Sequence, residues 1–171
     1  MNRLPFLAVS LLPLVSCAAL AQIPNPAPVP PAIQAAKTIF ISNAGADSGL
    51  FPSPFTGDPS RGYTEFYTAL QRSGQYQLVS DPSQADLVLE LKLTAPYGPS
   101  NPNKAEGASD PRPMFTLTVY DRSTHYVLWT LTQSINLAIL QKTHDRNFDD
   151  ALNGIVSQFE LLSRKQPAAT P

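Results

Sequence analysis

Three segments of the chain place an apolar residue at every second position, and this pattern constrains the fold more than any other feature. The three segments are residues 87–93, 115–119 and 127–131. Successive side chains of a strand point to opposite faces, so each segment is predicted to be a strand with one buried face. Only the turn 121–125 separates the last two segments, which predicts an antiparallel hairpin.

Two further strands and two helices complete the expected fold. Residues 38–42 and 76–79 are short, β-branched or aromatic segments typical of strands. Residues 63–70 and 148–162 repeat apolar side chains every three or four positions, which predicts two helices with one apolar face each. The order β-α-β-β-β-β-α favours an α+β fold. Its two layers would be a mostly antiparallel sheet of about five strands and two helices packed on one face.

Residues 1–21 have the composition of a signal peptide. Arg3 precedes an apolar stretch, residues 4–15, that is too short to cross a bilayer as a helix. Ala19-Leu20-Ala21 predicts cleavage before Gln22, whereas Leu14-Val15-Ser16-Cys17 resembles a lipobox, in which Cys17 becomes the acylated first residue. Both interpretations predict an exported protein, periplasmic or secreted. The second adds a membrane anchor through the lipid on Cys17.

The remaining chain divides into a spacer, one domain and a tail. Residues 22–36 contain five prolines between Pro24 and Pro31, which favours an extended, polyproline-II-like spacer. We expect a single α+β domain over residues 37–163 and a disordered tail over 164–171. Within the domain, residues 43–62 and 94–113 are rich in glycine and proline and are predicted to be long loops.

Composition argues against several classes of function. The chain has 171 residues, with 12 basic against 13 acidic side chains, so a nucleic-acid partner is not expected. One cysteine and two histidines leave little basis for a disulfide framework or a metal centre. The spacing of the glycines fits neither a phosphate-binding nor a dinucleotide-binding motif, and no Gly-x-Ser-x-Gly sequence occurs. We therefore expect no cofactor and no catalytic residue set.

Four short phrases resemble a layout found in bacterial envelope proteins. They are Ala85-Asp86-Leu87-Val88, Tyr120-Asp121-Arg122-Ser123-Thr124, Val127-Leu128-Trp129 and Asp145-Arg146-Asn147-Phe148-Asp149-Asp150-Ala151-Leu152. The pattern is similar to small periplasmic domains at the start of TolB and in CsgG-like lipoproteins, and to uncharacterised families of exported bacterial proteins. The resemblance covers residues 37–163 and implies an envelope accessory or assembly role. His125 stands where the turn of that layout usually has glycine, and histidine tolerates a positive φ better than most residues.

The densest group of polar side chains lies near the start of the final helix. On a catalytic interpretation, His144 would be a general base, and Asp145, Asp149 and Asp150 would orient it or bind a metal ion. Alternatively, Asp145 or Asn147 caps the helix and the other acids complement its dipole, and this structural interpretation is the one we favour. His125 is interpreted in the same way, as a turn residue.

Phe51 and Phe55 are the aromatic residues that the strand and helix patterns do not explain. Both lie in the Gly/Pro-rich segment Leu50-Phe51-Pro52-Ser53-Pro54-Phe55. Either they fold back onto the sheet, which we favour, or they stand exposed as a contact for a partner.

The sequence thus favours a non-enzymatic, exported cell-envelope protein that acts as a binding or assembly module. Its expected partner is another envelope protein, bound through a loop or a free sheet edge. One alternative is a small periplasmic hydrolase that uses carboxylates, and another is a small-ligand binder with its pocket between the two long loops. The oligomeric state stays open.

Overall fold

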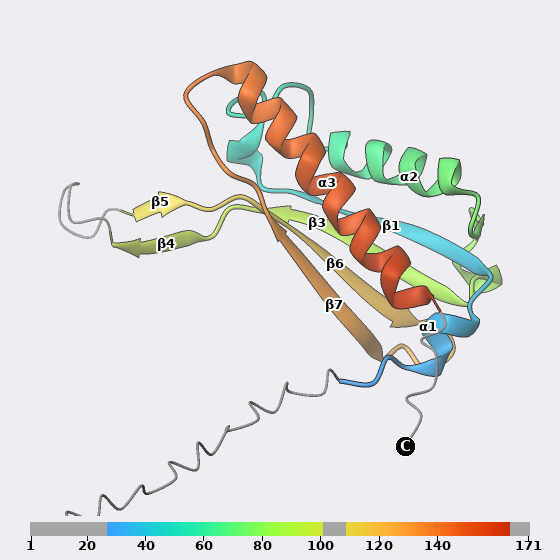
Figure 1. The fold of residues 1–171 in the computed structure, drawn as a ribbon. Coiled ribbons are helices and arrows are strands. Elements are labelled where there is room, and N and C mark those ends of the chain that lie inside the picture. Colours follow the sequence, from blue (N-terminus) through green and yellow to red (C-terminus); the bar gives the residue numbers. More distant parts are fainter. Residues whose placement is uncertain (1–26, 101–108, 165–171) are drawn as a thin grey trace, which may run out of the picture.

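The computed structural model describes residues 27–100 and 109–164. Within these residues, both long helices lie on one face of an open sheet (Figure 1). The strands are β1 (Thr38–Ala46), β2 (Gln77–Leu78), β3 (Leu87–Thr94), β4 (Tyr97–Ser100), β5 (Ser109–Pro111), β6 (Met114–Asp121) and β7 (Val127–Ser134). The helices are α1 (Pro31–Ala35), α2 (Arg61–Ser73) and α3 (Gln141–Ser163), with 3-10 turns at Ser48–Leu50 and Pro82–Gln84.

The α+β class and the five-stranded main sheet are confirmed. The strand order is β2-β1-β3-β6-β7. β3, β6 and β7 pair antiparallel, as the alternating segments predicted, whereas β1 pairs in parallel with both β2 and β3. A parallel neighbour requires a crossover connection, and α2 supplies it by carrying the chain from β1 across the sheet to β2. The sheet is therefore mixed.

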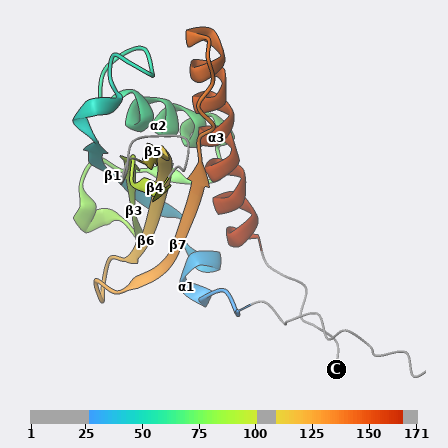
Figure 2. The ribbon, with the colours of Figure 1, turned by 90° about the vertical axis from the view of Figure 1, so that its left-hand side faces the viewer.

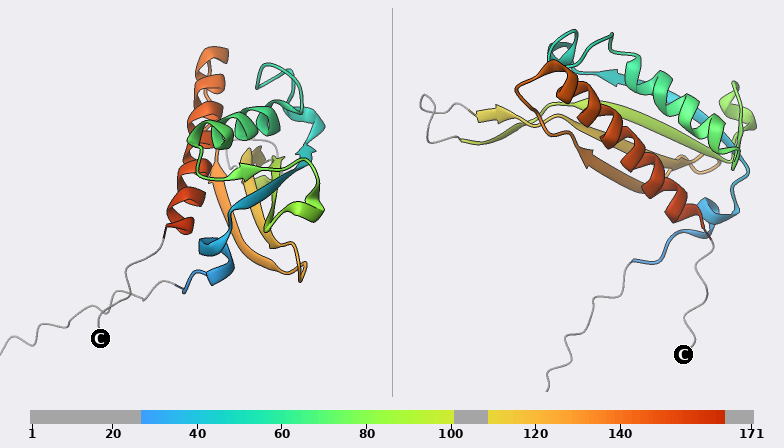
Figure 3. Two further views of the ribbon diagram at one scale, coloured as in Figure 1. Left: turned by 90° about the vertical axis from the view of Figure 1, so that its right-hand side faces the viewer. Right: turned by 45° about the horizontal axis from the view of Figure 1, so that its top comes forward.

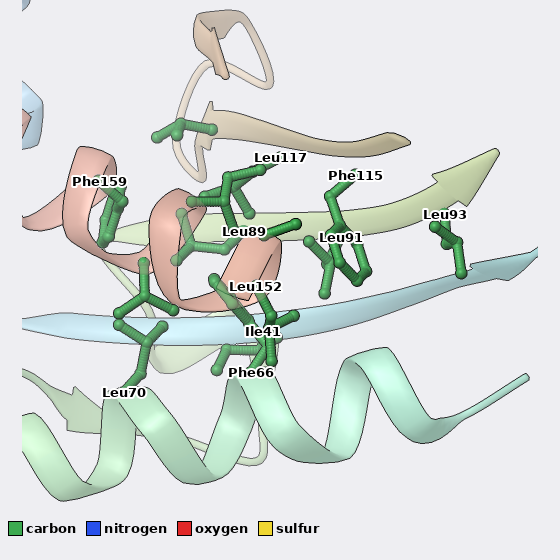
Figure 4. Close-up of a cluster of buried hydrophobic side chains, with 14 of the residues drawn as sticks. Ile41, Phe66, Leu70, Leu89, Leu91, Leu93, Phe115, Leu117, Leu152 and Phe159 are labelled. Carbon is green, nitrogen blue, oxygen red and sulfur yellow. The ribbon is translucent and has the colours of Figure 1, made fainter. Parts of the chain in front are cut away.

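The core lies between the sheet and the two helices, which cover the same face (Figures 3 and 4). On the central strand β3, every second residue from Leu87 to Leu93 is buried, as the alternation predicted. On α2, Phe66 and Leu70 point into the same core. Alternation on the strands and helical spacing on the helices therefore gather one continuous apolar cluster.

The sequence predicted that the domain begins at Lys37, but in the structure the domain begins earlier than this residue. Pro31 opens the short helix α1, a position where its missing N–H is not needed. Ile33 in this helix is completely buried in the main core, and Val29 packs against it. The spacer interpretation is thus wrong for residues 31–36, because an apolar side chain there completes the core. Residues 1–26, with the predicted signal peptide and Cys17, and the predicted tail at 165–171 lie outside the described residues.

Of two predicted irregular segments, one is more ordered than expected and the other is a turn as predicted. Residues 94–113 were predicted to be a loop, but β4 and β5 form a hairpin that extends the β3–β6 pair beyond the main sheet (Figure 1). Residues 101–108 of this segment lie outside the described residues. In the turn after β6, His125 adopts the predicted positive φ, 61°. The carboxylate of Asp121 accepts hydrogen bonds from the main-chain N–H groups of Ser123 and Thr124 and so closes that turn.

Helix α3 begins at Gln141, six residues before the position where the sequence placed Asn147 as its cap. Its first two turns carry polar side chains, so the apolar periodicity that predicted the helix starts only at Phe148. No helix within residues 27–100 and 109–164 has the length and apolar character needed to cross a bilayer.

The opposite faces of β3 provide a test of this architecture. Leu89→Ala removes a fully buried side chain and should lower the free energy of unfolding by about 2–5 kcal/mol. Val88→Ala changes the neighbouring residue, which faces away from the helices, and should cost about 1 kcal/mol or less. Urea unfolding measures both, and equal losses would contradict the assignment of the core face.

Candidate functional site

The segment between β1 and α2 folds back onto the start of α3. We call residues 47–60 the cover loop. Phe55 of the cover loop is completely buried, with its ring centroid 5.1 Å from that of Phe148 on α3. Phe51 is half-buried, 6.2 Å from Phe148. The packed alternative therefore holds, and a partner contact through Phe55 is wrong because its side chain is enclosed in the core. Most of Phe51 is likewise turned inward.

One arginine joins α2, α3 and the cover loop. Arg61 lies at the first turn of α2, and its guanidinium donates from Nη1 to Asp145 Oδ1 (2.7 Å) and from Nη2 to Asp149 Oδ1 (2.6 Å), both on α3. Its Nε donates to Glu65 one turn along α2 (2.8 Å). The guanidinium carbon also lies 4.3 Å from the centroid of the Phe148 ring. A planar fork of donors suits this geometry, because it can serve several carboxylates at once.

Asp145 extends this connection to the cover loop. Its Oδ1 accepts hydrogen bonds from the main-chain N–H of Thr56 (3.0 Å) and from the Thr56 hydroxyl (2.9 Å). Burial by itself would raise the pKa of Asp145, but the bonds from Thr56, Arg61 and Gln141 outweigh it and lower the pKa from 3.8 to about 2. Asp145 is therefore ionised at physiological pH. It lies inside α3 rather than at its cap, so the capping interpretation is wrong for this residue.

An apolar groove of about 600 Å³ lies where the cover loop meets the β4–β5 hairpin. The two loops that the sequence proposed as walls of a ligand pocket, 43–62 and 94–113, supply all but one of its lining residues. The lining residues are Asp47, Gly49, Leu50, Pro54, Ala95, Tyr97, Pro111, Pro113 and, from the segment after β7, Leu137. The cover loop and the hairpin lie at the same end of the molecule in Figures 1 and 3.

Hydrogen bonds fix the cover loop on both sides of this groove. Asp47 accepts a bond from the main-chain N–H of Ala95 at the end of β3 (2.7 Å). On the other side, Gln141 Nε2 donates to the carbonyl of Pro54 (2.5 Å). With the Arg61–Asp145 pair, these bonds hold the groove open as a preformed feature of the fold.

Large apolar side chains stand exposed around the groove. Tyr97 in its wall is 80% exposed. In the segment that follows Leu137, the side chains of Ile139 and Leu140 are 98% and 68% exposed. The next residue, Gln141, donates a hydrogen bond to Pro54 of the groove, which places this segment beside it. A concentration of exposed apolar side chains at one place marks an interaction surface. We call the groove together with Ile139 and Leu140 the apolar end.

The polar group around His144 does not form the arrangement that a general base would require. Asp145 and Asp149 are oriented toward Arg61, and the His144 ring packs edge-on against Phe55. Its Nδ1 is buried without a hydrogen-bond partner among the described residues. Within residues 27–100 and 109–164, no three His, Cys, Asp or Glu side chains gather in a way that could hold a metal ion.

Two of the phrases that carried the resemblance to envelope domains, those around Asp86 and Arg122, lie at the other end of the sheet. Asp86 Oδ2 accepts hydrogen bonds from the main-chain N–H groups of Lys37 (2.8 Å) and Thr38 (3.0 Å), fixing the start of β1 beside β3. Arg122 Nε donates to the carbonyl of Ala85 across the same end (3.2 Å). In the described structure these motif residues hold strand ends together.

Neither family models nor curated proteins match the sequence, whereas solved structures match the fold. A DUF4136 family protein from Bacteroides thetaiotaomicron is 14% identical with a TM-score of 0.51, covering 78% of this chain and 92% of its own. A PelC dodecamer from Paraburkholderia phytofirmans is 14% identical, covers 76% of this chain and 89% of its own, and has a TM-score of 0.43. The LpoB C-terminal domain from Salmonella enterica is 12% identical, with coverages of 59% and 83% and a TM-score of 0.37.

These likenesses concern the fold. The DUF4136 protein shares the α+β architecture over most of both chains, and its identity is too low to carry a function across. The resemblance to TolB and CsgG-like domains stays an expectation from the sequence.

Sequence reasoning did not single out Arg61 or the exposed part of the apolar end. Arg61 precedes Glu65 by four residues on the predicted helix, a spacing typical of helical ion pairs, but its bonds to α3 depend on the tertiary packing. The signal for the apolar end was the run Ile135-Asn136-Leu137-Ala138-Ile139-Leu140, which is apolar yet follows neither the strand nor the helix period.

Arg61→Ala tests the role of the guanidinium. The change leaves the Asp145 and Asp149 carboxylates without their main cation and should lower the free energy of unfolding by about 2–3 kcal/mol. Arg61→Lys should lie between Arg61→Ala and the wild type, because one ammonium cannot serve three carboxylates. Hydrogen exchange over residues 47–60 should accelerate in both variants. Arg72→Ala, an exposed arginine on the same helix, is the control and should change stability by less than about 0.5 kcal/mol.

The pH dependence of stability tests Asp145 separately. Because folding lowers its pKa from 3.8 to about 2, the carboxylate stabilises the fold above pH 3.8, and this contribution is lost as the pH falls through about 2. Asp145→Asn should therefore be less stable than the wild type near pH 6, and the difference should shrink toward pH 2. Urea unfolding across this range measures it, with the exposed Asp150→Asn as control. A difference that is constant with pH would contradict the assignment.

Proposed function

We propose that this chain is an exported cell-envelope protein that binds another envelope protein through the apolar end. The carrying observation is a preformed apolar groove of about 600 Å³ with Tyr97, 80% exposed, in its wall. Exposed aromatic side chains beside a groove are the usual anchors of protein interfaces, because a partner can bury them fully at little cost in conformational entropy.

The extent of the apolar surface favours a protein segment as the occupant. Ile139 and Leu140 lie beyond the groove itself and are 98% and 68% exposed, so a molecule that fills only the groove would leave them in water. A partner segment that enters the groove and continues over these side chains would bury the whole apolar end. The exposed polar residues of the cover loop beside it would supply the rim.

Export and the absence of enzymatic activity are parts of the same proposal. Export is supported by the signal-peptide composition of residues 1–21, with Cys17 as the residue that would carry a lipid anchor. A carboxylate hydrolase needs two acidic groups facing a substrate. Asp47 is the one carboxylate that lines the groove within the described residues, and it accepts a hydrogen bond from Ala95.

A second candidate is a carrier of a small apolar molecule. The groove volume of about 600 Å³ falls within the range of small-molecule sites, roughly 300–1,000 Å³, and most of its lining residues are apolar. Under this alternative the groove itself is the site, and Ile139 and Leu140 do not take part.

Site-specific photocrosslinking in a bacterium that carries the protein distinguishes the candidates. A benzoylphenylalanine at Leu137 should give one covalent protein adduct of defined mass, whereas the same probe at Ser123, at the opposite end of the sheet, should not. Tyr97→Ser should reduce the adduct at Leu137 about tenfold, since it removes the anchor. Native mass spectrometry of the purified protein would reveal an apolar small molecule instead. A bound small molecule without an adduct favours the second candidate. If neither an adduct nor a bound small molecule is found, both candidates are contradicted.

A further inference from the structure

The strand β7 presents a long and unprotected sheet edge. In the described structure it pairs with β6 on one side only, in unbroken register from Trp129 to Ser134 and with an irregularity at Leu128 (Figure 2). This segment contains no charged residue and no proline, which are two of the devices that prevent edge strands from pairing. The opposite edge of the sheet, β2, is only the two residues Gln77–Leu78.

The hydrogen-bond pattern identifies which main-chain groups face outward. The N–H of Ile135 donates to the carbonyl of Pro113, which directs Ile135 toward β6. Because the direction alternates along an antiparallel strand, Gln133 and Leu131 also bond to β6. The N–H and C=O groups of Thr130, Thr132 and Ser134 therefore point away from the sheet, and all three residues are exposed.

An apolar groove runs beside this edge on the helical face. Its volume is about 410 Å³, and it is lined by Ala27, Val29, Trp129, Leu131, Gln158, Leu161, Leu162 and Arg164. Leu161 on α3, which lines this groove, is 61% exposed. A strand added to the β7 edge would therefore bring apolar surface against apolar surface as well as main-chain hydrogen bonds.

We propose that a second copy of this chain occupies the edge, with the two β7 strands antiparallel about a two-fold axis at Thr132. This register pairs Thr132 with itself and Thr130 with Ser134 of the other copy, and it forms about six main-chain hydrogen bonds. The two-fold axis is perpendicular to the sheet, so both helical layers lie on the same side of one continuous ten-stranded sheet.

Charge and the course of the chain favour a copy of the same protein as the occupant. A strand that faces itself across a two-fold axis opposes like charges wherever it carries them, and β7 carries none. After Ser134 the chain climbs from the sheet to the start of α3 (Figure 2). In the dimer, this ascending segment of one copy passes the Trp129–Leu161 groove of the other, on the helical face.

The first test is the mass of the mature protein in solution at about 100 µM. A dimer is expected from light scattering. Thr132→Pro removes one outward N–H without affecting the bonds to β6, and should raise the dissociation constant at least about tenfold. Thr132→Val keeps the N–H and should stay dimeric. Far-UV circular dichroism verifies that both variants are folded.

The second test reports the register. The chain from Gln22 onward contains no cysteine, so a single cysteine can be introduced without interference. Thr132→Cys places the two sulfurs on directly opposed residues, about 5.5 Å apart at Cα, a separation that permits a disulfide. Thr130→Cys is the matched control, because the two cysteines would be about 13 Å apart along the strands. Mild oxidation should therefore cross-link Thr132→Cys and leave Thr130→Cys monomeric on a non-reducing gel.

A monomer at this concentration, a dimer that Thr132→Pro does not weaken, or equal cross-linking at both positions would each overturn the proposal. Tyr97→Ser lies outside the β7 edge and should leave the dimer intact. A failure of the groove proposal and a failure of the dimer are therefore separate results.

Discussion

The position of the cover loop depends on the Arg61 guanidinium. A loop rich in glycine and proline has little internal structure to hold it, and the sheet leaves it at the margin of the core. Arg61 joins it to α3 by binding Asp145, which in turn accepts two hydrogen bonds from Thr56. The ring of Phe148 lies under the guanidinium, so the ionic contacts form on top of an aromatic cluster that includes Phe55. Charge and packing thus act on the same few side chains.

Of the two surfaces for which we propose partners, only the groove depends on this arrangement. With the cover loop fixed, Leu50 and Pro54 form one wall of the groove, and the β4–β5 hairpin supplies the other. The second surface follows from topology, because β7 is the last strand to join the sheet and the chain then leaves for α3. One surface is a groove between irregular segments and the other is a row of main-chain groups, so they can bind different partners at the same time.

Local patterns in the sequence predicted the strands and helices and their buried faces. They did not predict strand pairing or ion pairs between residues far apart in the chain. The alternation at Leu87–Leu93 predicted β3 and its buried face, because the period of a strand is a property of the backbone. The parallel pairing of β1 with β3 brings together segments far apart in the sequence, and no local pattern reports it. Asp145 was interpreted as a helix cap for the same reason, since its true partner, Arg61, lies 84 residues away.

Export is the premise of the proposed role as an envelope binding module, since an envelope partner lies outside the cytoplasm. The most direct measurement is the intact mass of the protein recovered from the envelope of a bacterium that produces it. We predict a chain that has lost its leader: either an unmodified chain that begins at Gln22, or a chain that begins at Cys17 with added acyl mass. A full-length chain that still begins at Met1 would contradict export and, with it, the role of an envelope binding module.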